Sequence, residues 1–173
     1  IAGLLAIALL VSICPNDFFV SAATSENVGT KFEVETASGM AGDTVKVDVS
    51  IVNNPGIIGA TLKINYEDSL TLVDAAAGDA FAALDMTKPG QYVSGCNFIW
   101  DAQNIEQDQI KDGVILSLTF AVNADAEVNK THKISIEADT DDVFDADFND
   151  IPFEIVSGGI LVIDYLPGDV NSD

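Results

Sequence analysis

Hydrophobic and polar residues alternate with a period of two along much of this chain, and the clearest case is the segment 114–122. One side of that segment would carry Val114, Leu116, Leu118, Phe120 and Val122, and the other side Ile115, Ser117, Thr119 and Ala121. Because side chains of a β-strand point alternately to its two faces, the first set predicts a face packed in a core. The second set predicts an outer face without charge, which either another part of the chain covers or a partner binds.

Similar alternation predicts further strands, which turn-forming residues separate. The expected strands cover 31–36, 44–52, 58–66, 70–73, 92–100, 133–138 and the two halves of 152–163 on either side of a glycine bend. The alanine-rich segment 75–84 is expected to form a helical turn that is interrupted at Gly78. Eight or nine short strands with hardly any helix predict an all-β sandwich or barrel.

The charge of the chain narrows its possible functions. Its 173 residues carry 28 acidic side chains against seven lysines and no arginine, which gives a formal net charge of −21. This charge argues against nucleic acid as a partner, because neutralising phosphates requires a basic surface, and an anionic membrane would repel the chain. It favours a soluble secreted protein, calcium binding, or a partner with basic patches. A hydrophobic content of 48% suits one domain with a substantial core.

The first residues are expected to be a targeting signal rather than part of the fold. Residues 1–13 are uncharged, about as long as the apolar core of a signal peptide, and too short to span a bilayer. We expect residues 1–22 to be a signal peptide truncated at its N-terminus, cleaved after Ala22 or one residue later, and residues 23–30 to be a short leader. A lipoprotein signal ending at Cys14 is the disfavoured alternative, because the preceding isoleucine is larger than the residue usual there. The mature chain would then be secreted without membrane insertion.

The cysteines and the histidine argue against thiol catalysis. Signal cleavage would leave Cys96 as a single cysteine, which excludes an internal disulfide. A catalytic thiol needs a nearby histidine, and the only histidine, His132, lies in the lysine-rich segment 129–133, which is expected to be a polar turn. The sequence therefore predicts that Cys96 is a small buried hydrophobic residue.

Two acidic segments could bind calcium, which takes about six to eight oxygen ligands. The segment 139–150 contains six aspartates, but their spacing does not match a calcium loop, and Phe144 and Phe148 are expected to anchor the segment to a core. A solvated β-hairpin is therefore favoured there. The first, third and fifth positions of an EF-hand-type loop are matched near the end of the chain by Asp169, Asn171 and Asp173.

Several segments, taken in order, resemble the cohesin domains of cellulosomal scaffoldins over residues 31–164. The matching segments are 41–45, the turn and strand 55–67, the turn and strand 111–120, and the hairpin that begins at 144–147 and ends at 156–160. The resemblance implies a nine-stranded β-sandwich with jelly-roll topology, no catalysis, and no cofactor in this domain. It also implies a flat sheet face, built partly from the third, fifth and sixth strands, that binds a dockerin module of another protein.

Position by position, the resemblance places the outward residues of the third and sixth strands on the partner-binding face. These residues are Gly59, Thr61, Lys63 and Asn65 on the third strand, and Ile115, Ser117, Thr119 and Ala121 on the sixth. The assignment agrees with the uncharged outer face inferred from the alternation at 114–122, and it favours a partner surface over a covered one. A face without charge can be buried in an interface without leaving charges unpaired.

The resemblance also implies a role for the C-terminal segment, residues 165–173. Residues 165–173 look like a linker followed by the start of a dockerin's first calcium loop, for which calcium would be the cofactor. A cohesin followed by a dockerin would be an adaptor scaffoldin, and its own dockerin, if complete, would bind a cohesin in turn. We therefore expect an extracellular protein of the cellulosome or the cell surface that helps to assemble polysaccharide-degrading complexes.

Two other functions compete with protein docking. A carbohydrate-binding module of a secreted polysaccharide-degrading system would need a row of exposed aromatic rings, and the amphipathic candidates are Tyr66, Tyr92, Trp100 and Tyr165. A glycosidase would need two carboxylates about 5 to 10 Å apart in a cleft. Acidic residues are abundant, but none lies in a recognisable catalytic motif, so a glycosidase is the least favoured of the three.

Overall fold

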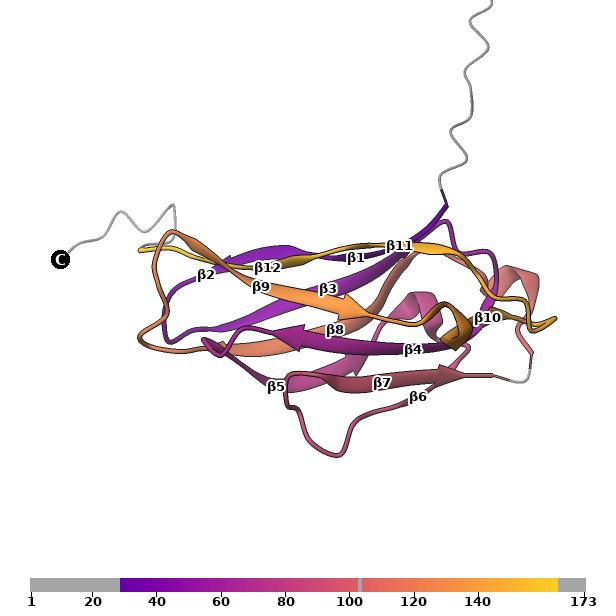
Figure 1. Cartoon of the computed structure of the whole chain (residues 1–173), viewed down its shortest axis with the longest axis horizontal. Helices are drawn as coiled ribbons and strands as arrows, with labels where there is room; N and C mark the ends of the chain where they lie inside the picture. Colours follow the sequence, from indigo (N-terminus) through magenta and orange to yellow (C-terminus); the bar gives the residue numbers. More distant parts are fainter. Residues whose placement is uncertain (1–28, 103, 165–173) are drawn as a thin grey trace, which may run out of the picture.

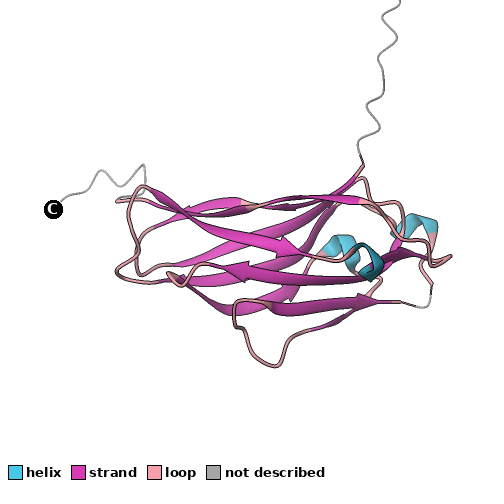
Figure 2. Ribbon diagram, in the orientation of Figure 1, coloured by secondary structure: helices cyan, strands magenta, loops and turns pink. Residues whose placement is uncertain are grey.

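The computed structural model describes residues 29–102 and 104–164. The expected signal peptide at 1–22 and the expected calcium ligands Asp169, Asn171 and Asp173 lie outside the described residues. The described part is built almost entirely from strands that run along the long axis of the molecule (Figures 1 and 2). The predicted all-β sandwich is therefore confirmed.

Twelve strands and three short 3-10 helices follow one another along the described residues. The strands are β1 (Thr30–Val34), β2 (Thr36–Gly39), β3 (Thr44–Val52), β4 (Ile57–Tyr66), β5 (Leu70–Ala77), β6 (Asp85–Thr87), β7 (Cys96–Asp101), β8 (Gly113–Val122), β9 (Lys130–Glu137), β10 (Val143–Asp145), β11 (Phe153–Val156) and β12 (Gly158–Val162). The helices are η1 (Asp79–Phe81), η2 (Gln107–Gln109) and η3 (Thr140–Asp142).

The strands form two sheets that face each other. Sheet A has the order β11-β1-β3-β8-β5. Sheet B has the order β2-β12-β9-β4-β7-β6, and β10 also pairs with β4. Along one edge of β4, β9 pairs with its C-terminal half and β10 with its N-terminal half, so β10 continues the sheet where β9 ends.

The strand number exceeds the nine implied by the resemblance, partly because two segments change sheets. The chain passes from sheet A to sheet B at Glu35, between β1 and β2, and again at Ser157, between β11 and β12. The two crossings lie side by side, since the Gly159 amide donates a hydrogen bond to the Glu35 carbonyl at 3.1 Å. A Cβ on Gly158 would overlap the carbonyl oxygens of Val34 and Glu35, so this close approach requires glycine.

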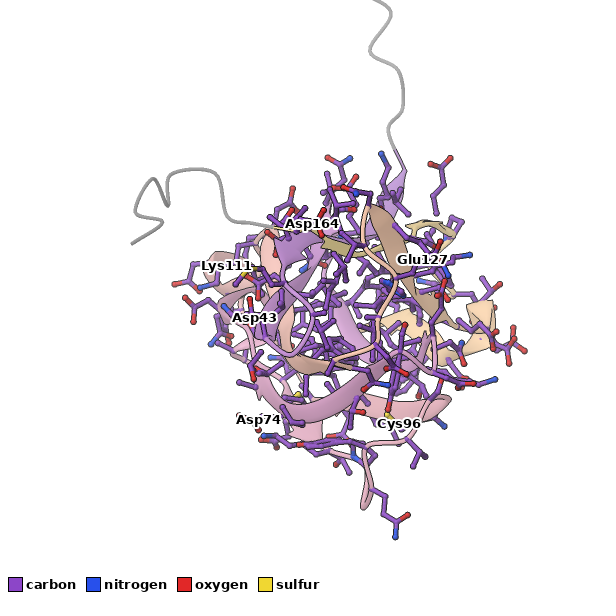
Figure 3. All side chains as sticks on the ribbon, turned by 90° about the vertical axis from the view of Figure 1, so that its left-hand side faces the viewer. Asp43, Asp74, Cys96, Lys111, Glu127 and Asp164 are labelled. Atoms are coloured by element: carbon purple, nitrogen blue, oxygen red, sulfur yellow. The ribbon has the colours of Figure 1, made fainter. Side chains whose placement is uncertain are left out.

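The core fills the space between the sheets, and the alternating residues of the central strands supply it. Leu116, Leu118 and Phe120 of β8 are fully buried, as the alternation predicts. Further large, fully buried side chains come from β1, β3, β4, β7 and η1, among them Phe32, Ile51, Leu62, Trp100 and Phe81. Figure 3, which looks along the long axis, shows side chains packed between the sheets. Of the acidic residues labelled there, Asp74, Glu127 and Asp164 are exposed and Asp43 is partly exposed.

Two local expectations differ from the structure. The segment 75–84 is not mainly helical, because β5 extends to Ala77 and only η1 follows Gly78. Gly78 lies against the start of β8, where a Cβ would overlap the Val114 carbonyl group. The expected strand 92–100 begins only at Cys96, because residues 92–95 form a turn in which the Cys96 amide bonds to the Val93 carbonyl at 3.0 Å.

Candidate protein-binding surface

The outer face of β8 matches the prediction at three positions and differs at the fourth. Ser117, Thr119 and Ala121 are partly exposed on the side opposite the core residues of the strand. Ile115 has no exposed surface and belongs to the core, so its predicted outward position is wrong.

The cause is a β-bulge at the start of β8. Val49 of β3 lies opposite Leu116, whereas the next residue, Ser50, lies opposite Val114, which leaves Ile115 as an extra residue without a partner on β3. A bulge of this kind interrupts the alternation, so Ile115 and Leu116 are both buried and Val114 is partly exposed. The Ile115 carbonyl accepts a hydrogen bond from the Gly78 amide at 2.9 Å, which ties the bulge to the segment before η1.

Although β8 has an uncharged outer face, the neighbouring strand brings charge beside it. Lys46 and Asp48 of β3 lie opposite Thr119 and Ser117, and the Lys46 ammonium lies 3.1 Å from the Asp48 carboxylate. The Ser117 hydroxyl donates a hydrogen bond to the same carboxylate at 2.6 Å. The uncharged surface is therefore one strand wide, and its central hydroxyl is already hydrogen-bonded within the sheet.

The two predicted sets of site residues do not lie on one surface. The third strand of the sequence prediction is β4 and the fifth is β7, and these are neighbours in sheet B. The sixth is β8, which lies between β3 and β5 in sheet A. The face expected from the third, fifth and sixth strands is wrong for the sixth, because β8 hydrogen-bonds within the opposite sheet.

The outer face of β4 is largely neutral. Gly59 is buried because the ring of Phe144, its cross-strand partner on β10, covers it, so the expectation that Gly59 is exposed is wrong. Thr61 and Asn65 are partly exposed, and Lys63 is exposed. The strands on either side add Asn97, Ile99 and Ser135 at the positions opposite these residues.

One ion pair lies on this face. The Lys63 ammonium lies 2.7 Å from the Glu137 carboxylate, and these two residues are cross-strand partners on β4 and β9. The hydrogen bond from Lys63 lowers the pKa of Glu137. The two charges cancel, so the centre of this face, from Thr61 to Asn65 on β4 with Asn97 and Ile99 on β7, carries little net charge. Ile99 keeps 40% of its surface exposed there. Exposed carboxylates lie at one end of the face, where Asp101 of β7 is opposite Gly59 and Asp85 of β6 is opposite Asp101.

The sequence analysis missed Ile99, Asn97 and Glu137. The alternation of Cys96, Phe98 and Trp100, all buried, places the first two of these on the outer face of β7. This alternation is visible in the sequence, so the outward positions of Asn97 and Ile99 could have been predicted from it. The position of Glu137 beside Lys63 depends on long-range strand pairing, which alternation does not determine.

The acidic segment 139–150 forms a hairpin-like turn. The strand β10 pairs with β4, and Phe144 also makes an isolated bridge with Asp150. The carboxylate of Asp145 accepts hydrogen bonds at 2.9 Å from the amides of Asp147 and Asn149. The backbone hydrogen bond from Asn149 is the main cause of the lowered pKa of Asp145. Within the residues that the structure describes, no three His, Cys, Asp or Glu side chains are grouped as metal ligands.

The aromatic residues do not form a row on the surface of the described part. Trp100 is 1% exposed, so it cannot stack on a sugar ring. Tyr66 is partly buried and donates a hydrogen bond to the Tyr92 carbonyl at 3.0 Å, and Tyr92 stacks on the buried ring of Phe98. The fourth candidate, Tyr165, lies outside the described residues. This arrangement argues against the carbohydrate-binding alternative.

The cysteine and the histidine are both structural. Cys96 is buried, as predicted, and its burial raises the pKa of the thiol, so the nucleophilic thiolate is disfavoured. His132 is not in a polar turn: it lies on β9 and is 2% exposed. Its Nδ1 lies 2.6 Å from the Ser69 hydroxyl and its Nε2 lies 3.0 Å from the Glu127 carbonyl, so both ring nitrogens have partners.

The family model for the cohesin domain matches residues 30–162, which include both sheets. This chain belongs to the cohesin family. Cohesin domains are protein-interaction modules without catalytic activity. No curated protein matches this cohesin in a sequence comparison.

Solved cohesin structures share the fold of this cohesin at low sequence identity. The seventh ScaB type I cohesin from Pseudobacteroides cellulosolvens is 18% identical, with a TM-score of 0.69 over 84% of this chain and 99% of that one. A non-cellulosomal cohesin from the archaeon Archaeoglobus fulgidus is 17% identical, with a TM-score of 0.66 over 79% and 92%. The OlpC cohesin from Clostridium thermocellum, solved in complex with a dockerin, is 22% identical, with a TM-score of 0.66 over 78% and 93%.

None of the helices in residues 29–102 and 104–164 of this cohesin is long and apolar enough to cross a membrane.

Proposed function

We propose that this cohesin binds a dockerin module through the outer face of sheet B, centred on Thr61, Lys63 and Asn65 of β4. Family membership supports a protein partner, and several cohesins of the same fold were solved as dockerin complexes. The observation that carries the choice of face is the central surface of low net charge formed by Thr61, Lys63 and Asn65 of β4 with Asn97 and Ile99 of β7, of which Ile99 is exposed beside Thr61. A partner can cover this central part of the face without desolvating unpaired charges.

The outer face of sheet A is less suited to this role. It carries two ion pairs, Lys31 with Glu33 at 3.4 Å and Lys46 with Asp48 at 3.1 Å, whereas the described part of the sheet B face carries the single pair of Lys63 with Glu137. Ser117, at the centre of the predicted β8 surface, is held by Asp48. The proposed interface therefore retains Thr61, Lys63 and Asn65 of the sequence prediction and leaves out Gly59 and the residues of β8.

Two exposed apolar residues on opposite sheets provide a matched test. Ile99 lies on β7 of sheet B, and Val73, 48% exposed, lies on β5 of sheet A. Calorimetric titration against the dockerin modules encoded in the same genome should show that the Ile99→Asp variant loses binding while the Val73→Asp variant binds like the wild type. Equal binding by the wild type and the Ile99→Asp variant, or loss only in the Val73→Asp variant, would place the interface elsewhere.

We further propose that the chain is secreted and acts as an adaptor scaffoldin in extracellular, cellulosome-type complexes. The apolar segment at 1–13 supports secretion, and the loop-like spacing of Asp169, Asn171 and Asp173 supports the start of a dockerin whose own partner would be a cohesin. Reading the open reading frame beyond Asp173 tests the adaptor role. A glycine next, then a helix and a second such loop support it, and any other continuation overturns it.

A further inference from the structure

An exposed aromatic stack lies at the β10 end of the sheet B face. Phe148 is 76% exposed, and among the described residues it is the one aromatic side chain that is mostly exposed. Its ring stacks on that of Phe144, with 5.7 Å between centroids and 23° between planes. The sequence analysis expected Phe148 to anchor the segment to a core, and that expectation is wrong.

The backbone holds Phe148 in this exposed position. Its φ angle is +60°, in the left-handed region that bulky side chains rarely adopt. Hydrogen bonds close the turn on both sides, because the Phe148 amide donates to the Asp145 carbonyl at 3.0 Å and the Asp145 amide donates to the Asn149 carbonyl at 3.1 Å. The exposed ring therefore belongs to an ordered turn. A partner that binds the ring does not have to order the backbone of this turn, which lowers the entropy cost of binding.

The stack is continuous with the proposed dockerin-binding face. Phe144 lies opposite Gly59 on the outer side of sheet B, and its ring occupies the space that a Cβ on Gly59 would need. Thr61 and Lys63 follow Gly59 at alternate positions on the same face of β4. Phe148, stacked on Phe144, therefore extends one end of that face.

The surroundings of the ring are acidic. The segment 139–150 carries six aspartates and no lysine, and Asp147 and Asp150, both exposed, lie close to Phe148 in the chain. The face of an aromatic ring attracts a cation, and carboxylates near the ring attract the same cation by their own charge. An exposed phenyl ring with an acidic rim thus complements a lysine or arginine side chain on a partner.

We infer that Phe148 and Asp147 form a second anchor point, which binds a basic side chain of the dockerin at the edge of the sheet B face. The inference rests on the proposed function, since it names the chemistry of the same partner. Phe148 supplies the ring and Asp147 the charge. Phe144 acts as a positioning residue that fixes the ring above β4.

The test uses a dockerin that the wild-type chain binds, chosen by titration from those encoded in the same genome. Phe148→Asn removes the ring but keeps a residue that tolerates a positive φ angle, so the turn is expected to keep its conformation. This variant should bind about tenfold more weakly, with an unchanged unfolding midpoint. Phe148→Tyr should bind like the wild type, Asp147→Asn should weaken binding and make it less sensitive to salt, and the control Val73→Asn should do neither.

The outcomes separate this inference from the proposed function. If the wild type binds none of the dockerins, the proposed function fails, and the inference fails with it. If the wild type binds and Phe148→Asn binds equally well, only the inference is overturned. It is also overturned if Phe148→Asn loses stability along with affinity, or if affinity electrophoresis in soluble xylan or cellulose derivatives shows that Phe148 retains a polysaccharide instead.

Discussion

Substitutions at Ile115 and Val114 test the bulge that decides which side of β8 each of them faces. Ile115 is fully buried in the core, whereas the neighbouring Val114 is partly exposed. Truncating a buried isoleucine to alanine removes its packing and leaves a cavity, so Ile115→Ala should lower the free energy of unfolding by about 2–5 kcal/mol. Val114→Ala removes two methyl groups from a partly solvated site, and we expect a loss below about 1 kcal/mol.

Substituting aspartate at the same two positions should give a larger difference in stability than substituting alanine. A carboxylate at Ile115 would lie in the core among apolar side chains, and a domain of this size is stable by only about 5–15 kcal/mol, so Ile115→Asp should not fold. Val114→Asp should fold, because its side chain reaches solvent. Urea denaturation followed by tryptophan fluorescence of the buried Trp100 measures all four variants. Equal losses for the two alanine variants, or a folded Ile115→Asp variant, would refute the bulge assignment.

Three further predictions concern the core, the covered glycine and the surface ion pair. Leu118→Ala should lower the free energy of unfolding by about 2–5 kcal/mol in the same assay, because Leu118 is fully buried; an unchanged midpoint would contradict its core position. Gly59→Ala should cost about 1–3 kcal/mol, because the new methyl group must displace the Phe144 ring, and the double variant Gly59→Ala with Phe144→Ala should lose less than the sum of the single losses. Lys63→Met should raise the pKa of Glu137 in an NMR titration of its carboxyl group, since the hydrogen bond from Lys63 is the main cause of the lowering. Because the folded-state pKa of Glu137 lies below its unfolded value, the pair stabilises the fold above the unfolded pKa, and this contribution is lost as pH falls through the folded pKa.

The alternation of the sequence predicted most of the strands and their buried faces. On β3, Val45, Val47, Val49 and Ile51 are all buried, and β4 buries Ala60, Leu62 and Ile64 in the same way. The buried faces could be predicted because the alternation of side chains is a local property of an extended chain and does not depend on which strand it pairs with. Cys96 was also placed correctly, since a lone cysteine in an apolar strand is usually buried.

The features that the sequence did not reveal depend on pairing between distant segments. Alternation shows which residues share a face of a strand, but it does not show which sheet the strand joins. The sheet of β8 was therefore inferred from the resemblance by strand order, and that placed β8 on the wrong surface. The bulge at Ile115 has no local signature, because an apolar residue fits either side of an apolar strand. Phe148 was misplaced because its exposed ring lies in a turn, where the residue has a positive φ angle and its amide bonds to the Asp145 carbonyl, and the alternation of a strand does not describe such a turn.

The central claim, that the outer face of sheet B binds a dockerin, is tested most directly by mapping the interface residue by residue. Backbone amide chemical shifts of the isotopically labelled chain would be followed by NMR while an unlabelled dockerin from the same genome is added. We predict that the amides of β4, β7 and β9, together with those around Phe148, shift or broaden, and that those of β3, β5 and β8 do not. Changes confined to sheet A, or no change with any of these dockerins, would contradict the claim.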